Sequence, residues 1–219
     1  MGDQQMINTI LQLADIQKEY DSGKPILQNV NFSVSEGTIV AITGENGTGK
    51  STLLRIIAGL DSSYKGDVMF RNEKHIKAST EIILLNQSYE QLFPWLTVVQ
   101  NVTQPIQLSQ GKSHQVAREK ACEALANVGI DETLFQRYPF QLSGGQKQKV
   151  ALARALALEP DILLMDEPFS AIDEKSRASF QTMLKKLAEV ENKTIILVSH
   201  STEEVNKLTN NVVCLTKTS

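Results

Sequence analysis

The chain has 219 residues, a formal net charge of −3 and 41% apolar residues. This length suffices for one sizeable core or two small lobes. The absence of a basic excess argues against a nucleic-acid-binding protein, and no apolar run approaches the ~18 residues of a membrane-spanning helix. Two cysteines, Cys122 and Cys214, lie far apart in apolar surroundings. We expect both to be buried thiols in a reducing cytoplasm, because the N-terminus also lacks the apolar run of a signal peptide.

The first part of the chain has the pattern of strands. Residues 11–20 and 30–34 alternate between apolar and polar side chains, and 67–71 is a further short candidate. No helix-length segment separates these strands, which predicts antiparallel pairing. Residues 31–37 resemble a hairpin arm and turn that lead into the apolar strand 38–42.

A glycine-rich segment, 44–52, follows strand 38–42 and precedes a helix-like run, 53–60. Glycines allow backbone N–H groups to point inward, and the start of a helix adds a positive dipole end, so this order predicts a phosphate-binding loop. Lys50 would reach the β- and γ-phosphates of a nucleotide, and the Ser51 hydroxyl would bind Mg²⁺. The alternative is a glycine turn that merely precedes a helix. The loop comprises Gly44, Glu45, Asn46, Gly47, Thr48, Gly49, Lys50, Ser51 and Thr52.

A helical segment then interrupts the α/β pattern. Residues 82–85 read as a buried strand, but the following loop carries the only tryptophan, Trp95, and residues 113–128 have apolar side chains at helical spacing. Thr97 could cap a helix that starts at Val98, and Gly129 could end the helix over 113–128. We therefore predict one domain, 1–219, with a helical subdomain at 88–155 inside a catalytic core formed by 1–87 and 156–219.

A second glycine-rich helix start occurs at Leu142–Gln146, where Ser143 occupies an N-cap position. Each of Gly144 and Gly145 lowers helix propensity by about 1 kcal/mol, so an ordinary capped helix would not favour them. Glycine here permits the close approach of an anion or another backbone. The alternative, a simple capped helix, stays open on these residues alone.

Two buried strands end in polar residues. Strand 162–166 delivers Asp166 and Glu167, and strand 193–198 ends before His200. Ligands bind at the carboxyl edge of open α/β sheets, so Asp166 is a candidate Mg²⁺ ligand. Glu167, on the opposite face of the same strand, would face an attacking water. The alternatives are two surface acids and a structural histidine.

Together these motifs closely resemble the ATP-binding subunit of ABC transporters over nearly the whole chain. Residues 44–52 match the Walker A loop, Leu142–Gln146 match the family signature, and 162–167 match Walker B with its catalytic glutamate. Four single residues match further family positions: the adenine-stacking Tyr20, the Q-loop glutamine Gln87, the D-loop aspartate Asp173 and the switch histidine His200.

The resemblance implies a fold, a reaction and a composite site. The fold is an α/β P-loop NTPase core with an antiparallel β subdomain and an inserted α-helical subdomain. Two copies, or one copy and a related subunit, would pair head to tail around two ATP molecules. Each site would take the Walker motifs from one copy and Ser143, Gly144, Gly145 and Gln146 from the other. The implied catalytic residues are Lys50, Glu167 and His200, and the implied Mg²⁺ ligands are Ser51, Gln87 and Asp166.

The segment Phe93–Val98 resembles the nitrate, sulfonate and taurine importer group, whose separate permeases would dock near Gln87, Phe93 and Trp95. The subunit would then be peripheral on the inner face of the cell membrane, without an appended regulatory domain. Glu45-Asn46 and Ile172 depart from the usual residues of that group. The alternatives are the ATPase of an exporter or lipoprotein-extraction complex, and a non-transport ABC ATPase.

Overall fold

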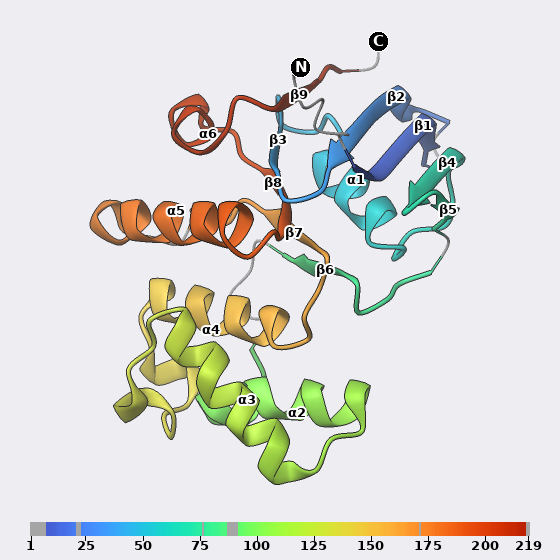
Figure 1. Cartoon of the computed structure of the whole chain (residues 1–219). Helices are drawn as coiled ribbons and strands as arrows, with labels where there is room; N and C mark the ends of the chain where they lie inside the picture. The colour runs from blue at the N-terminus through green and yellow to red at the C-terminus, as the bar shows by residue number, and fades with distance from the viewer. Residues whose placement is uncertain (1–7, 21–22, 76, 87–91, 171, 218–219) are drawn as a thin grey trace, which may run out of the picture.

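The structure is a computed structural model that describes residues 8–20, 23–75, 77–86, 92–170 and 172–217. Both a parallel and an antiparallel sheet are present (Figure 1). The strands are β1 (Thr9–Glu19), β2 (Pro25–Ser35), β3 (Ile39–Gly44), β4 (Lys65–Phe70), β5 (Glu73–Lys74), β6 (Ile82–Leu85), β7 (Ile162–Asp166), β8 (Thr194–Val198) and β9 (Val212–Leu215). The helices are α1 (Lys50–Ile57), α2 (Val98–Gln110), α3 (His114–Asn127), α4 (Gly144–Leu156), α5 (Glu174–Glu189) and α6 (Thr202–Leu208), with short 3-10 helices η2 (Glu132–Leu134) and η3 (Pro139–Gln141).

A five-stranded parallel sheet in the order β6-β7-β8-β3-β9 forms the centre of the molecule. Its strands alternate between two apolar cores. Along β7, Ile162 and Leu164 enter one core, whereas Leu163 and Met165 enter the other. Both faces of the sheet are therefore covered, which explains why the central positions of β7 and β8 are continuously apolar.

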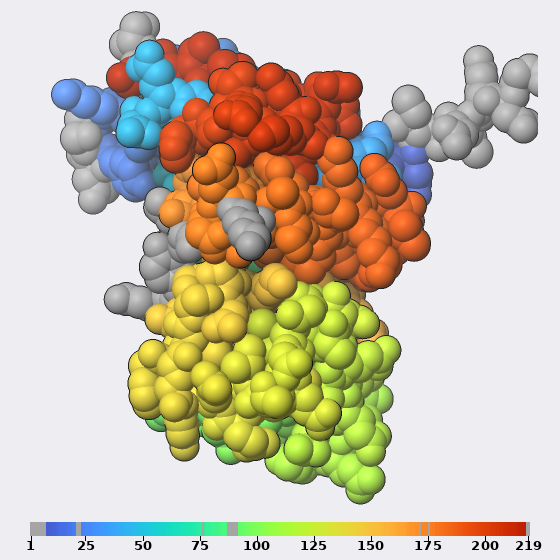
Figure 2. All heavy atoms as spheres, turned by 90° about the vertical axis from the view of Figure 1, so that its left-hand side faces the viewer, coloured from blue at the N-terminus to red at the C-terminus, as the bar shows by residue number. Residues whose placement is uncertain are grey.

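Different elements cover the two faces. On one side, α1 and the antiparallel sheet β2-β1-β4-β5 share a core with the central strands. On the other side, α5 and the helices α2, α3 and α4 share the second core. Figure 2 shows the helical lobe, coloured green to yellow, as a body stacked against α5 in orange.

The predicted hairpin between the strands on either side of residue 37 is wrong. β2 pairs with β1, and β1 pairs with β4, both antiparallel as expected. β3 instead joins the parallel sheet between β8 and β9. Gly37, at φ +69°, carries the chain from one sheet to the other, and the hydroxyl of Thr38 donates to the carbonyl of Ser35 at 2.7 Å within this turn. A turn signal shows that the chain bends but not which strand it pairs with next.

Buried Asn101 anchors the aromatic loop at the start of the helical lobe. Its Nδ2 donates to the carbonyls of Phe93, Leu96 and Thr97 at 3.0–3.1 Å. Its Oδ1 accepts from the N–H of Phe93 at 2.7 Å. The predicted cap of α2 is confirmed, since the Thr97 hydroxyl accepts from the N–H of Gln100. The loop that carries Trp95 is thus fixed by a fully satisfied polar side chain.

The expectation of two buried cysteines is wrong for Cys214 and only partly right for Cys122. Cys214 is exposed because β9 is an edge strand whose alternate side chains leave the core. Cys122 is half-buried against the second core. Among the described residues, no helix combines the length and the apolar character needed to cross a bilayer.

Candidate functional site

The loop between β3 and α1 has a backbone that requires glycine. Gly47 and Gly49 have φ values of +81° and +87°, which side chains rarely adopt. A Cβ on Gly49 would lie 2.8 Å from Cδ2 of Leu27 and 3.0 Å from the carbonyl oxygen of Ile26. The loop is therefore packed directly on β2 at Gly49.

Lys50 lies inside this loop although it carries a charge. Its side chain is buried, and its Nζ donates to the carbonyls of Gly44 and Glu45 at 2.9 and 2.8 Å. These carbonyls satisfy a cation that would otherwise be costly to bury. The adjacent Ser51 is exposed, so its hydroxyl is accessible at the mouth of the site.

A cavity of about 510 Å³ lies above the loop and between the ends of β7 and β8. Its lining combines backbone N–H donors, an ammonium, hydroxyls and carboxylates, the groups that phosphates and a divalent cation require. The lining residues are Ile26, Asn46, Gly47, Gly49, Lys50, Ser51, Thr52, Asp166, Glu167, Val198 and His200. Most of the predicted loop and strand-end residues thus meet in one place.

A backbone turn after β7, not the alternation of side chains along a strand, sets the direction of the Glu167 side chain. β7 ends at Asp166, and Glu167 adopts φ +48°, an unusual conformation for a residue with a side chain. Its N–H donates to Val198 at 3.1 Å, and its carbonyl accepts from the Ser170 hydroxyl at 2.9 Å. Our expectation that Glu167 continues the strand is therefore wrong, because this turn sets its direction. Strain of this kind is typical of functional sites.

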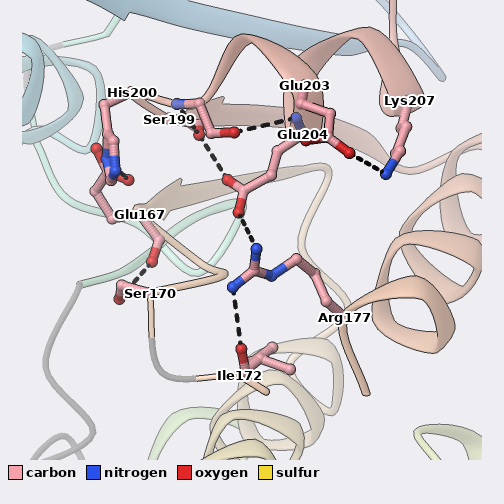
Figure 3. Close-up of polar contacts among 10 residues, drawn as sticks. Glu167, Ser170, Ile172, Arg177, Ser199, His200, Glu203, Glu204 and Lys207 are labelled. Atoms are coloured by element: carbon pink, nitrogen blue, oxygen red, sulfur yellow. Dashed lines mark hydrogen bonds and ion pairs between the residues drawn. The ribbon is translucent and has the colours of Figure 1, made fainter. Parts of the chain in front are cut away.

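Glu167 and His200 face each other across the ends of the two strands (Figure 3). The Oε2 of Glu167 lies 2.9 Å from Nδ1 of His200. The glutamate side chain is 14% exposed and the histidine side chain 68% exposed. A carboxylate held beside an imidazole is suited to orient water and accept its proton.

Tyr20 lies beside the cavity with its ring 52% exposed. Its hydroxyl is 3.2 Å from Oγ1 of Thr52, and the Nζ of Lys18 lies 5.7 Å from the ring centroid. Lys18 is buried and donates to Asp61 and to the carbonyl of Ser63 at 2.9 and 2.6 Å. Sequence reasoning missed Lys18, which lies at the end of β1, two residues before Tyr20.

The pKa of Asp61 reflects its burial and its contacts with Lys18 and Ser63. Partial burial alone would raise its pKa, but the hydrogen bonds from Lys18 and the Ser63 N–H, together with the charge of Lys18, outweigh this and lower the pKa. The ion pair therefore stays charged and holds Lys18 beneath the aromatic ring.

The second glycine-rich helix start lies elsewhere in the chain. The hydroxyl of Ser143 accepts from the N–H of Gln146, and the N–H of Ser143 donates to Oε1 of Gln146, which confirms the predicted N-cap. Ser143, Gly145 and Gln146 line a separate cavity of about 290 Å³ against α5. Asp173 caps α5 by accepting from the N–H of Ser176 at 3.0 Å. None of the described signature residues lines the phosphate cavity.

Three predicted parts of the site remain: Gln87, the aromatic loop and Glu45. Gln87 lies outside the described residues. Phe93 and Trp95 pack ring to ring at 5.6 Å, with Trp95 69% exposed. Glu45 points into solvent and pairs with Lys217 at 2.8 Å, and this ion pair lowers the pKa of the Glu45 carboxyl. The unusual glutamate is thus compatible with the loop.

The donor set fits Mg²⁺ bound together with a nucleotide. Across the part of the chain that the structure describes, no three acidic, histidine or cysteine side chains cluster as a metal site. Mg²⁺ usually takes one or two carboxylates and completes its shell with phosphate oxygens and water. One carboxylate, Asp166, and one hydroxyl, Ser51, at the same cavity match that requirement.

A model of the ABC transporter family matches residues 27–170. The chain belongs to this family. Its relatives include a sulfate/thiosulfate import ATP-binding protein of Halalkalibacterium halodurans, 39% identical over 93% of this chain, and an aliphatic sulfonates import ATP-binding protein of Bacillus cereus, 38% identical over 87%. The chain spans 58% of the first relative's length and 73% of the second's.

Comparison with solved structures points to the same family. A dimeric bacterial ABC transporter cassette, MJ0796, superposes with a TM-score of 0.84 at 34% identity over 94% of both chains. A dimeric post-hydrolysis state of the same cassette, bound to ADP and Pi, gives 0.82 at 34% identity over 93% of this chain and 96% of that one. The predicted P-loop α/β fold and the assignment to an ATP-hydrolysing family are confirmed. The subdomain boundaries and the role of each site residue stay predictions.

Proposed function

We propose that the chain is the ATP-hydrolysing motor subunit of an ABC importer that drives separate permease subunits. The single observation that carries this proposal is the cavity between the phosphate-binding loop and the ends of β7 and β8. Relatives named as import ATP-binding proteins for sulfate, sulfonates and polyamines support import. A small oxyanion such as a sulfonate is the solute class we favour, because the loop Phe93–Val98 resembles that group.

In the proposed reaction, the loop N–H groups and Lys50 bind the β- and γ-phosphates of ATP, and Tyr20 stacks on the adenine. Ser51 and Asp166, with Gln87 as the proposed third ligand, hold Mg²⁺, which when bound neutralises charge on the phosphates. Glu167 orients the attacking water and takes its proton. His200 fixes the Glu167 carboxylate and contacts the γ-phosphate.

The separation of the two glycine-rich helix starts supports a head-to-tail dimer. One chain has a phosphate cavity, and its signature residues, Ser143 to Gln146, lie outside that cavity. A second copy placed head to tail would bring its signature helix α4 to the γ-phosphate, with the dipole and free N–H groups of that helix facing the anion. The cassette MJ0796, which resembles this chain, is dimeric in both of its solved structures reported above.

The permease would dock on the helical lobe near Gln87, Phe93 and Trp95. The exposed Trp95 ring is held in place by packing on Phe93 and by the Asn101 hydrogen bonds to its loop. An aromatic side chain fixed in this way loses little entropy on binding, which suits it to an interface. The subunit would then lie on the inner face of the membrane, held there by its permease.

The proposal is tested with Glu167→Gln. This variant keeps the side-chain volume but cannot take a proton, so we expect it to bind ATP, to dimerise, and to lose at least about 100-fold in kcat. Glu203→Gln on the exposed face of α6 is the matched control and should hydrolyse ATP at the wild-type rate. Full ATP turnover by Glu167→Gln would contradict the assigned role. Solute uptake that is unchanged on deletion of the subunit would contradict import.

A further inference from the structure

A continuous set of polar side chains connects the loop before α5 to the loop that carries His200 (Figure 3). It starts at the carbonyl of Ile172, which accepts from NH2 of Arg177 at 3.2 Å. NH1 of the same guanidinium lies 3.1 Å from Oε1 of Glu204. Two charged side chains thus span the distance between α5 and α6.

The other carboxylate oxygen of Glu204 continues the connection. Oε2 accepts from the hydroxyl of Ser199 at 2.9 Å, and the Ser199 oxygen accepts from the N–H of Ser201 at 3.1 Å. The Ser201 hydroxyl in turn accepts from the N–H of Glu204 at 3.3 Å. His200 lies between these two serines. The backbone of His200 is therefore held on both sides, by Ser199 and Ser201, and each of these serines makes a hydrogen bond with Glu204.

The burial of these groups distinguishes them from an ordinary surface pair. Ser199 is fully buried and the Glu204 side chain is only 12% exposed. On the same helix, Glu203 and Lys207 form an i,i+4 pair that is 79% and 58% exposed. Solvent and salt screen such an exposed pair, whereas a partly buried carboxylate depends on its remaining partners. Loss of Arg177 would therefore change the position of Glu204 rather than leave it solvated in place.

The other end of the set lies at residues 172–173. Arg177 lies in the first turn of α5, and its guanidinium folds back over the N-terminus of this helix to reach the carbonyl of Ile172. Ile172 lines the same cavity as Ser143, Gly145 and Gln146. In the proposed dimer, which this inference takes as given, this loop therefore lies beside the helix start that meets the second copy. A displacement of Ile172 on docking would pull directly on Arg177.

We propose that Arg177 and Glu204 are positioning residues that set the place of His200 according to whether a second copy occupies the loop at Asp173. Neither side chain lines the phosphate cavity, so neither contacts ATP. The Arg177–Glu204 pair affects the hydrolysis step through His200, because Nδ1 of His200 lies 2.9 Å from the Glu167 carboxylate. The site of one copy is thereby sensitive to the presence of the other through hydrogen bonds of its own chain.

The test measures kcat, the KM for MgATP, and the unfolding temperature of the full chain carrying Arg177→Met, Glu204→Gln, both changes together, or Ser199→Ala. We expect each single change to lower kcat about tenfold while KM stays within about twofold, since a misplaced catalytic group affects rate more than binding. The double variant should lose no more than either single variant, because both belong to one connection. Glu203→Gln, the matched control, should behave as wild type.

Two further measurements separate this inference from the proposed function. Glu167→Gln is combined with Arg177→Met, and the mass of the ATP-bound form is measured; we expect a dimer, as for Glu167→Gln alone. If Glu167→Gln itself stays monomeric with ATP, the proposed dimer fails. If it dimerises but folded Arg177→Met and Ser199→Ala keep wild-type kcat, or if the single losses add in the double variant, the positioning role is wrong.

Discussion

At the scale of single residues, Tyr20 is held by two contacts, one through its hydroxyl and one through its ring. Its hydroxyl meets Thr52, one residue beyond the Mg²⁺-binding Ser51 that we propose, and its ring lies over Lys18. A ring that is already fixed loses little conformational freedom when adenine stacks on it. The aromatic residue thus contributes a preformed surface rather than a flexible one.

We expect Tyr20→Ala to weaken ATP binding about tenfold, because one base–aromatic stack contributes ~1–3 kcal/mol and 1.4 kcal/mol is a factor of ten. Tyr20→Phe keeps the ring and should stay within about threefold of wild type. Titration calorimetry with ATP on a Glu167→Gln background measures both without turnover. Equal affinity of the alanine and phenylalanine variants would show that the ring does not stack on the base.

At the scale of elements, the sequence predicts where helices begin but not which sheet each strand joins. Thr97 and Ser143 cap helices as predicted, because an N-cap bond joins residues three apart in sequence. A helix also lies within the predicted range 113–128, where Ser113 is an N-cap that was not predicted. The assignment of β3 to the parallel sheet and the exposure of Cys214 depend on which strands become neighbours. That is decided by packing over long sequence distances, which a turn pattern does not encode.

The two serine caps provide a matched pair. Ser143→Ala and Ser113→Ala each remove a side-chain bond to a backbone N–H, so each should lower the free energy of unfolding by about 1 kcal/mol. Only Ser143→Ala should also reduce ATP turnover, because α4 begins at the proposed γ-phosphate contact and α3 does not. Urea titrations and steady-state ATPase assays measure the two effects. Equal turnover of both variants would remove Ser143 from the site.

The edge of the antiparallel sheet should respond to acid. Burial lowers the pKa of His75 from 6.5, outweighing the charge of Glu81 and a backbone hydrogen bond at Ile57 that both raise it. The unfolded chain then binds this proton more tightly, so the contribution of His75 to stability is complete above pH 6.5 and is lost as the pH falls below it. Urea unfolding between pH 8 and pH 5 should show a smaller decline for His75→Gln than for wild type. Parallel curves would contradict a buried neutral imidazole.

At the scale of the whole molecule, the meeting of the site residues at one sheet edge was predictable, but the contacts that orient them were not. The cavity gathers Lys50, Asp166, Glu167 and His200 from three strand ends, as the carboxyl edge of a parallel sheet predicts. The turn at Glu167 and the connection through Arg177 and Glu204 leave no recognisable sequence pattern, because each depends on side chains brought together only by the fold. In the proposed dimer, a second copy supplies the signature residues that are absent from the lining of the phosphate cavity.

The most direct test of this account mixes two inactive variants. Lys50→Ala removes the phosphate-binding lysine. Gly145→Asp places a carboxylate at the signature, where the added Cβ has no neighbour closer than 4.0 Å and the fold should persist. If each site combines halves from two copies, an equimolar mixture regains about a quarter of wild-type turnover, since half of its dimers hold one intact site of two. If the mixture stays as inactive as either variant alone, the site is complete within one chain and the account is wrong.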